Sequence, residues 1–255
     1  MNHQLLESQL KQLRLNTASN ELGTVLSKHK AAAHLPWVIE LLEREIESRK
    51  EKALSARIKS ARFPEVTSLE SFDWKFNPQI NESKIRELAQ GEFIPNNQIA
   101  LLLGKTGTGK THLALAIGIL AASRGVRVYC TSVKRLIHDI TVAKAKNALD
   151  VLFRKILSSQ LWILDDWGVV SMDRDQAEEV FDLLDRRKHS SAMILTSNRD
   201  VAEWNEMFPD PVLANAAIDR IFDRADVVLF EGPSYRMKGK IKFRSAVAEV
   251  KADGI

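Results

Sequence analysis

The stretch Gly104-Lys105-Thr106-Gly107-Thr108-Gly109-Lys110-Thr111 decides the fold of this chain. It fits the pattern G-x-x-x-x-G-K-[ST], in which the glycines let the backbone curl so that N–H groups point at phosphate oxygens. An apolar run at residues 99–103 precedes it, and a helix-forming segment from Thr111 onward follows it. A loop between a strand and a helix N-terminus is a favourable setting for an anion. We therefore expect all eight residues of the stretch to bind the phosphates of a nucleotide.

Two residues of this loop and two carboxylates further along the chain predict that the bound nucleotide is ATP with Mg²⁺. Lys110 would neutralise the β- and γ-phosphates, and Thr111 would place its hydroxyl on Mg²⁺. The apolar run 161–164 ends in Asp165 and Asp166, at the kind of strand end where α/β sheets bind ligands. We expect Asp165 to hold Mg²⁺ through water and Asp166 to orient or deprotonate the attacking water. Many ATP-hydrolysing enzymes have the longer glutamate at the second position of this acidic pair, where this chain has Asp166. We therefore expect slow turnover of ATP.

Three more polar residues are candidates for the chemistry. Asn198 follows the apolar run at residues 193–196 and could hydrogen-bond the attacking water or the γ-phosphate. The alternative is an ordinary turn asparagine. Arg220 precedes the last strand, where an arginine can face the nucleotide of a neighbouring subunit. Arg224 is the second choice for this intersubunit arginine, which is called an arginine finger. The alternative to a finger role is a surface ion pair with Asp219. Arg236 could reach the γ-phosphate of its own chain or simply belong to a basic tail.

Five short apolar runs predict an α/β fold with a five-stranded parallel sheet between helices. The runs are residues 99–103, 126–130, 161–164, 193–196 and 227–230. Each is separated from the next by enough chain for a helix, which is typical of parallel strands covered on both faces. We expect an ATPase domain at residues 98–255. Only residues 232–255 follow the last run, so we expect no C-terminal helical lid.

The chain before residue 98 predicts a small all-α domain and a connector. Residues 1–65 are rich in helix formers. An amphipathic first helix is indicated by Leu5, Leu6, Leu10, Leu13 and Leu15. A longer second helix is expected from Pro36, because proline suits a first helical turn. Residues 66–97 predict a connector whose apolar side chains dock onto the ATPase domain.

The bulk composition indicates a globular protein, and its charge distribution allows a nucleic acid partner without establishing one. The 255 residues are 45% hydrophobic and 27% charged, with no apolar run of the ~20 residues that a membrane span needs. The N-terminus has no secretory signal, and the single Cys130 suits a reducing cytoplasm. We therefore expect a cytoplasmic protein without a membrane partner. The net charge of +4 comes from basic ends on either side of a slightly acidic core.

A basic stretch on the presumed second helix is the candidate DNA-binding surface. Its members are Arg49, Lys50, Lys52, Arg57, Lys59 and Arg62. Phosphate contacts from such residues give affinity without sequence reading. The alternative is a solvated helix face that neighbouring glutamates balance. Because the sequence has no zinc-ligand set or base-reading motif, we expect weak sequence preference.

Taken in order, the nucleotide motifs resemble those of the AAA+ ATPases. More narrowly, the chain is similar to the IstB-type transposition helper ATPases that insertion sequences encode. The motifs are Gly-Lys-Thr-His-Leu-Ala at 109–114, Leu-Asp-Asp at 164–166, Thr-Ser-Asn-Arg at 196–199, Asp-Arg at 219–220 and Gly-x-Ser-Tyr-Arg at 232–236. The segments 10–15, 43–52 and 61–64 of the N-terminal section match as well. One departure is Asp223-Arg224, where many relatives have a histidine-bearing segment.

This resemblance implies a bacterial, ATP-hydrolysing, DNA-binding homo-oligomer with ATP sites between subunits. Such a protein assembles on duplex DNA and helps its transposase select and capture target DNA, and ATP hydrolysis regulates the assembly. The helicase loaders of bacterial replication share the ATPase motifs, so a helicase loader is the alternative. A third hypothesis, suggested by the Asp165-Asp166 pair, is a nucleotide-binding scaffold that barely hydrolyses ATP.

Overall fold

The computed structural model describes residues 2–28, 35–188 and 190–238. The chain divides into two compact units, Met1–Ser60 and Ala61–Ile255, which are described here one at a time. The boundary that we expected at residue 65 lies slightly beyond this division. The expected connector, residues 66–97, is part of the second unit.

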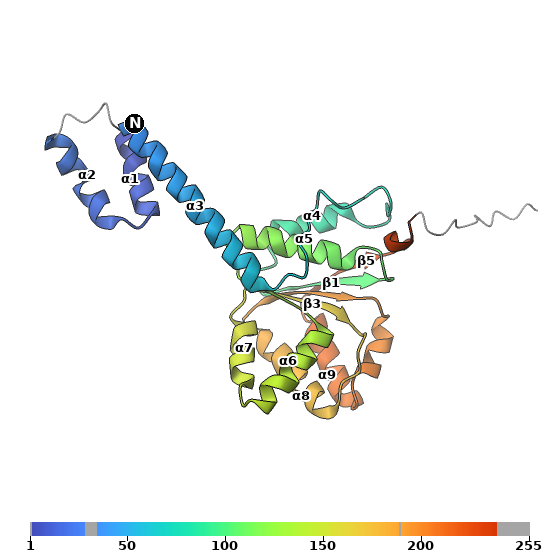
Figure 1. Cartoon of the computed structure of the whole chain (residues 1–255). Helices are drawn as coiled ribbons and strands as arrows, with labels where there is room; N and C mark the ends of the chain where they lie inside the picture. The colour runs from blue at the N-terminus through green and yellow to red at the C-terminus, as the bar shows by residue number, and fades with distance from the viewer. Residues whose placement is uncertain (1, 29–34, 189, 239–255) are drawn as a thin grey trace, which may run out of the picture. The chain divides into compact units, whose positions relative to one another are not determined.

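The first unit consists of α1 (Asn2–Gln12), α2 (Asn16–Lys28) and most of α3 (Leu35–Ala61), drawn in blue in Figure 1. Its small core contains Leu6, Leu10, Leu22 and Ile39, with Leu26, Val38 and Leu42 packed against them. The expectation of a single helix before the long one is wrong. The chain turns at Arg14, which has a left-handed φ of 58°, and a further helix, α2, begins at Asn16.

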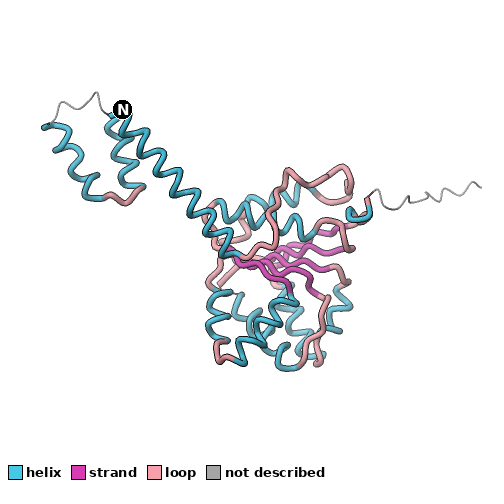
Figure 2. The backbone as a smooth tube through the Cα atoms, in the orientation of Figure 1, coloured by secondary structure: helices cyan, strands magenta, loops and turns pink. Residues whose placement is uncertain are grey.

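A five-stranded parallel sheet forms the centre of the second unit (Figure 2). Its strands are β1 (Ile99–Gly104), β2 (Val128–Ser132), β3 (Leu161–Trp167), β4 (Ala192–Ser197) and β5 (Ala225–Phe230). They lie in the order β2-β3-β4-β1-β5, and every pairing is parallel. The predicted α/β fold with a five-stranded sheet is therefore confirmed, although β2 starts later than the apolar run that predicted it.

Helices cover both faces of this sheet (Figure 1). One face packs against α4 (Glu82–Gln90) and α5 (Lys110–Ser123). The other packs against α6 (Val133–Ala145), α7 (Leu149–Leu157), α8 (Arg174–Arg187) and α9 (Pro211–Phe222). Successive residues of β1 alternate between the two cores: Leu101 belongs to one and Leu102 to the other, and both are fully buried. Burial on both sides explains why the strands appear in the sequence as continuous apolar runs.

The strand order determines where polar side chains can meet. Strand β4 lies between β1 and β3, so the loops that follow these three strands emerge at the same edge. Two short 3₁₀ segments, η2 (Val201–Met207) and η3 (Tyr235–Met237), complete the described chain. The expectation of no helical lid concerns a segment of which residues 239–255 lie outside the described residues. No helix in the described ranges is both long and apolar enough to span a membrane.

Candidate nucleotide-binding site

The phosphate-binding loop joins β1 to α5 and depends on glycine at three positions. Gly104, Gly107 and Gly109 have φ values of 142°, 80° and 101°, which side-chain-bearing residues rarely adopt. At Gly104 the space is also closed, because an added Cβ would lie 2.0 Å from the carbonyl oxygen of Phe230 in β5. Helix α5 begins at Lys110, so its positive N-terminal end lies at the loop.

Lys110 is buried in the loop as a poorly hydrated cation. Only 5% of the residue is exposed, and its Nζ donates to the carbonyl oxygens of Gly104 at 2.6 Å and Lys105 at 2.7 Å. Burial lowers the pKa of Lys110 to about 8; the carboxylates of Asp166 and Asp165 oppose this shift. Phosphate oxygens are stronger partners for an ammonium group than neutral carbonyls, so the lysine is poised to exchange one for the other.

A threonine from each of two elements fixes the orientation of Asp165. Thr111 Oγ1 donates to Asp165 Oδ1 at 2.8 Å, and Thr196 Oγ1, from β4, donates to the same oxygen at 2.5 Å. Thr196 Oγ1 also accepts from the backbone N–H of Asp166 at 3.1 Å. We did not predict Thr196, although it ends the apolar run of β4, the position from which a side chain reaches the neighbouring strand end.

The hydroxyl of Thr111 and the carboxylate of Asp165 fit Mg²⁺, because hard cations prefer oxygen ligands. Within the described ranges, no group of three or more His, Cys, Asp or Glu residues could form a complete metal cage. Mg²⁺ usually takes one or two protein ligands and completes its shell with phosphate oxygens and water.

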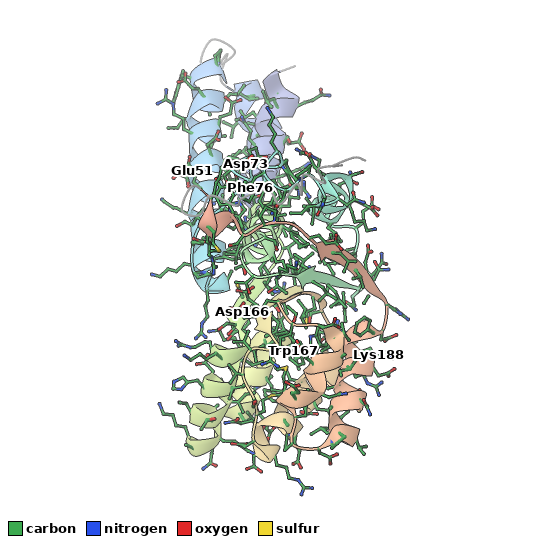
Figure 3. The ribbon with its side chains drawn as sticks, turned by 90° about the vertical axis from the view of Figure 1, so that its right-hand side faces the viewer. Glu51, Asp73, Phe76, Asp166, Trp167 and Lys188 are labelled. Carbon is green, nitrogen blue, oxygen red and sulfur yellow. The ribbon has the colours of Figure 1, made fainter. Side chains whose placement is uncertain are left out.

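Asp166, labelled in Figure 3, has a backbone conformation and an electrostatic environment unlike those of Asp165. Its φ of 59° is left-handed, and the register of β3 against β4 shifts between Leu164 and Trp167. Burial raises the pKa of Asp166, the Asp165 carboxylate raises it further, and Lys110 and Arg236 act against both. A carboxylate with a raised pKa is a better proton acceptor for water than an ordinary one.

These residues line one cavity of about 420 Å³. The predicted residues among its walls are Thr106, Gly107, Gly109, Lys110, Thr111, Asp165, Asp166, Asn198 and Arg236. Asn198 Nδ2 donates to Thr106 Oγ1 at 3.1 Å, so the end of β4 is tied to the loop. Glu65 also lines the cavity, and no pattern in the sequence pointed to it.

The connector and the segment after β5 are both fastened to the loop. Asn77 is 2% exposed, and its Nδ2 donates to the carbonyl oxygens of Thr108 at 3.5 Å and Pro233 at 3.3 Å. The backbone N–H of Tyr235 donates to the carbonyl of Gly107 at 2.8 Å. These bonds hold the segment that carries Arg236. Asn77 was not predicted, because it closes contacts between segments that are far apart in sequence.

An ion pair and an aromatic contact complete this attachment. Lys238 Nζ lies 2.6 Å from Asp73 Oδ2, and the rings of Phe76 and Tyr235 meet edge-on at 5.1 Å; Asp73 and Phe76 are labelled in Figure 3. Beside the loop they enclose a smaller cavity of about 110 Å³. Its walls include Phe72, Phe76, Asn77, His112 and Tyr235. An apolar, aromatic cavity next to the phosphate loop suits a flat heterocycle.

Arg220 lies on α9 and does not line the nucleotide cavity. Its Nε donates to Asp185 Oδ1 at 2.5 Å, and one terminal nitrogen donates to Asp219 Oδ2 at 3.0 Å. The hydrogen bond with Asp185 is the main reason that the pKa of Arg220 is raised. The surface ion pair that we considered as the alternative is thus present. An arginine finger would act on the nucleotide of a second chain. This role therefore stays a prediction for Arg220, as it does for Arg224.

The six basic residues proposed for DNA do not share one helix. Arg49, Lys50, Lys52, Arg57 and Lys59 lie on α3. Arg49 pairs with Glu45 at 2.6 Å and also bonds the carbonyl of Leu13. The placement of Arg62 was wrong: α3 ends at Ala61, and Arg62, with a φ of 63°, belongs to the second unit. There its guanidinium bonds the hydroxyl of Tyr129.

Comparison with known proteins identifies the family of this chain. The model of the family described as IstB-like ATP binding protein matches residues 6–243. A relative from Pseudomonas aeruginosa, named for ATP binding in insertion sequence IS21, is 36% identical over 239 residues, covering 93% of this chain and 90% of that protein. A relative from Bacillus thuringiensis subsp. berliner, named in the same way for insertion sequence IS232, is 32% identical and covers 92% and 95%.

Solved structures resemble the fold alone. AMPPCP-bound DnaA from Aquifex aeolicus has a TM-score of 0.56 at 22% identity, over 69% of this chain and 53% of that one. The DnaC helicase loader has a TM-score of 0.51 at 20% identity, over 58% and 87%. Both are likenesses in fold over part of the chain. With a family match across almost its entire length, the chain belongs to the IstB-like ATP binding proteins.

Proposed function

We propose that this protein is an ATP-dependent, DNA-binding AAA+ regulator of transposition. It oligomerises on duplex DNA and helps a cognate transposase select and capture target DNA, and ATP hydrolysis regulates the assembly. One observation carries the proposal: a connected network of the phosphate loop, Asp165, Asp166 and Thr196 lies in a chain whose relatives are named for insertion sequences. The expected location is the bacterial cytoplasm.

ATP would lie across both cavities beside the loop. The adenine base fits the smaller cavity, between aromatic side chains such as Phe72 and Tyr235. The triphosphate would follow the loop into the larger cavity, where Lys110 and the N–H groups at the start of α5 meet its oxygens. Thr111 and Asp165 would hold Mg²⁺, which supplies charge neutralisation to the β- and γ-phosphates.

Hydrolysis would depend on the residues grouped at the far end of the larger cavity. Asp166 accepts a proton from the attacking water, a role that its raised pKa favours. Asn198 orients the water or the γ-phosphate, and Arg236 neutralises charge that develops on the phosphate. Because Asp166 has a shorter side chain than glutamate, the water is held less closely and turnover is slow.

A second subunit would complete the site. Arg220 lies outside the nucleotide cavity of its own chain, on a partly exposed surface of α9. An arginine supplied in trans is a known way to stabilise charge in phosphoryl transfer. ATP at such a shared site links nucleotide binding to assembly. The basic residues of α3 are candidates to contact DNA phosphates with weak sequence preference.

Two other functions are less well supported. A helicase loader shares the fold, but the DnaC match covers 58% of the chain, whereas the insertion-sequence relative from Pseudomonas covers 93%. A scaffold that binds ATP without hydrolysing it is separated from the proposal by measuring phosphate release with and without DNA. A pull-down with a replicative helicase tests the loader.

The decisive experiment is assembly on DNA. Purified protein is mixed with duplex DNA and either ATP, ADP or no nucleotide, and particle size is followed by light scattering and electron microscopy. We expect large particles only with ATP, and none with the variant Lys110→Ala. An equal oligomer size with and without nucleotide contradicts the proposal.

A further inference from the structure

A further cavity, of about 490 Å³, lies next to the nucleotide site, and of its wall residues only Asp165 takes part in the chemistry above. Its walls are formed by Arg62, Pro64, Cys130, Thr131, Ser132, Arg135 and Asp165. It lies at the carboxyl end of β2, where Ser132 pairs in register with Asp165 of β3. The cavity therefore shares one wall, Asp165, with the nucleotide cavity.

Two arginines at this cavity share a single carboxylate, and Arg62 also bonds the hydroxyl of Tyr129. Arg62 bonds Asp139 Oδ2 at 3.0 Å, and Arg135 Nε bonds Asp139 Oδ1 at 2.9 Å. The Asp139 side chain is 16% exposed, whereas those of Arg62 and Arg135 are 40% and 63% exposed. Among the described residues, the two terminal nitrogens of Arg135 have no hydrogen-bond partner. One carboxylate thus pairs with two guanidinium groups and leaves part of their donor capacity unused.

A third cation lies close to the same cluster. Lys155 Nζ is 5.9 Å from the ring centroid of Tyr129, and the guanidinium of Arg62 is 5.6 Å from that centroid. The surrounding helices add further positive charge, because residues 133–157 hold six Lys/Arg against two Asp/Glu. Residues 61–238 as a whole hold 23 against 24, so positive charge in this unit is concentrated at α6 and α7.

We propose that this cavity binds a phosphate of a nucleic acid backbone. A guanidinium group that is held along one edge presents its free edge to a phosphate as a bidentate hydrogen-bond donor. A duplex also carries further phosphates at regular spacing, which the lysines of α6 and α7 can meet, whereas a free phosphate ion uses the arginines alone. The site deepens the proposed function, on which it rests, by giving DNA a contact on the ATPase unit in addition to α3.

The position of the cavity links DNA to ATP hydrolysis. A phosphate bound by Arg62 and Arg135 lies one strand away from the carboxylate that would hold Mg²⁺, because Ser132 and Asp165 are register partners. Because Asp165 lines both cavities, the charge of a phosphate bound in this one acts on a carboxylate of the nucleotide site. We expect DNA to stimulate phosphate release through this contact.

The test uses the full-length protein and fluorescence anisotropy with a labelled duplex over a series of salt concentrations. For Arg135→Gln we expect roughly tenfold weaker binding, the loss of one charged hydrogen-bonded contact. The slope of log affinity against log salt should fall by about 0.9, the value for one phosphate. Arg135→Lys keeps the charge and therefore the slope. Stimulation of phosphate release by DNA should fall in Arg135→Gln, while basal release stays unchanged.

The matched control is Arg174→Gln. Arg174 pairs with Glu178 four residues along α8, as Arg135 pairs with Asp139 on α6, and its side chain is 79% exposed. Its loss should change neither affinity nor slope. Equal changes in both variants, or none in Arg135→Gln, would overturn the site. Weaker binding of inorganic phosphate by Arg135→Gln in calorimetry, with unchanged affinity for DNA, would also overturn it in favour of a free-phosphate site. If the wild type itself fails to bind duplex DNA, the proposed function fails as well.

Discussion

Two cations that we assign to ATP chemistry are held in opposite ways. Lys110 is buried in the phosphate loop among neutral carbonyl oxygens, and burial lowers its pKa to about 8. Arg220 lies on the surface of α9 between Asp185 and Asp219, and the hydrogen bond with Asp185 raises its pKa. Among the described residues the lysine has no anionic partner in contact with it, whereas the arginine already has two.

The difference shows which interactions one chain completes by itself. A poorly solvated cation beside a phosphate loop gains most when an anion arrives, so Lys110 serves nucleotide binding within the chain. A cation already paired in a partly exposed position gains little from a single chain. Arg220 is therefore expected to act only when a second subunit presents its nucleotide. Substitutions at these two positions should separate effects on ATP binding by one chain from effects on ATP hydrolysis by the assembled oligomer.

The largest effect on ATP binding is expected for Lys110→Ala. Loss of the charged contacts to the triphosphate should weaken ATP binding by roughly a hundredfold or more. Titration calorimetry measures this directly, and far-ultraviolet circular dichroism checks that the fold is retained. ATP affinity close to that of the wild type would refute the role assigned to the loop.

Arg220→Ala should leave ATP binding by the free chain unchanged and lower turnover in the assembly by about 10³-fold, the range for an arginine finger. Phosphate release is measured above and below the protein concentration at which particles form. Arg186→Ala, which removes an ion-paired arginine of α8, is the control. Equal loss at both concentrations would show that Arg220 does not act between subunits.

Asp166→Asn should lower ATP turnover by about 10²-fold, because a general base is removed, while ATP affinity changes little. Asp165→Asn, in contrast, should weaken the binding of ATP with Mg²⁺. Single-turnover phosphate release and calorimetry on both variants separate the two carboxylates. If Asp166→Asn turned over at the wild-type rate, the third hypothesis of a scaffold with only residual hydrolysis would gain support.

The pH dependence of ATP binding should reveal the burial of Lys110. Its pKa of about 8 means that the lysine loses its proton as the pH rises through that value, and ATP favours the protonated form. Affinity should therefore fall above pH 8, by at most about tenfold per pH unit, with proton uptake on binding. Lys110→Arg keeps its charge in this range and should not show the decline.

The smallest effect is expected for Asp185→Asn. Because the ion pair with Arg220 lies at the surface, its loss should lower the melting temperature by no more than roughly 2 °C. Turnover in the assembly should change only a few-fold, in contrast to Arg220→Ala. Differential scanning calorimetry and phosphate release measure the two effects. A change as large as that of Arg220→Ala would assign Asp185 a direct role.

The parts of the site that the sequence predicted are local in the chain. The loop, Asp165 and Asp166 each follow an apolar run, so strand periodicity alone places them at one edge of the sheet. Thr196, Asn77 and Glu65 were not predicted, because each acts through contacts that only the folded topology creates. The small leucine-rich helices were harder still: nothing in their spacing marked the turn at Arg14 that separates α1 from α2.

Arg62 shows the same limit at a domain boundary. In the sequence it continues a row of basic residues, and helical periodicity predicts that the row shares one element. The left-handed turn at Arg62 ends α3 and places the side chain against Tyr129 and Asp139 instead. Charge patterns predict that a residue is exposed and cationic, but a single change of backbone conformation decides which unit it serves.

The amide of Asn77 also has a consequence for the order of folding. Its two bonds close sequence separations of 31 and 156 residues, between the connector and the loop and between the connector and the segment after β5. The pairing of β1 with β5 also closes a long separation, 126 residues from Ile99 to Ala225, but many hydrogen bonds offset its loop-closure entropy, whereas the amide of Asn77 makes only two. We therefore expect the sheet to form before the nucleotide site. In a refolding experiment, recovery of ATP binding should lag behind recovery of secondary structure.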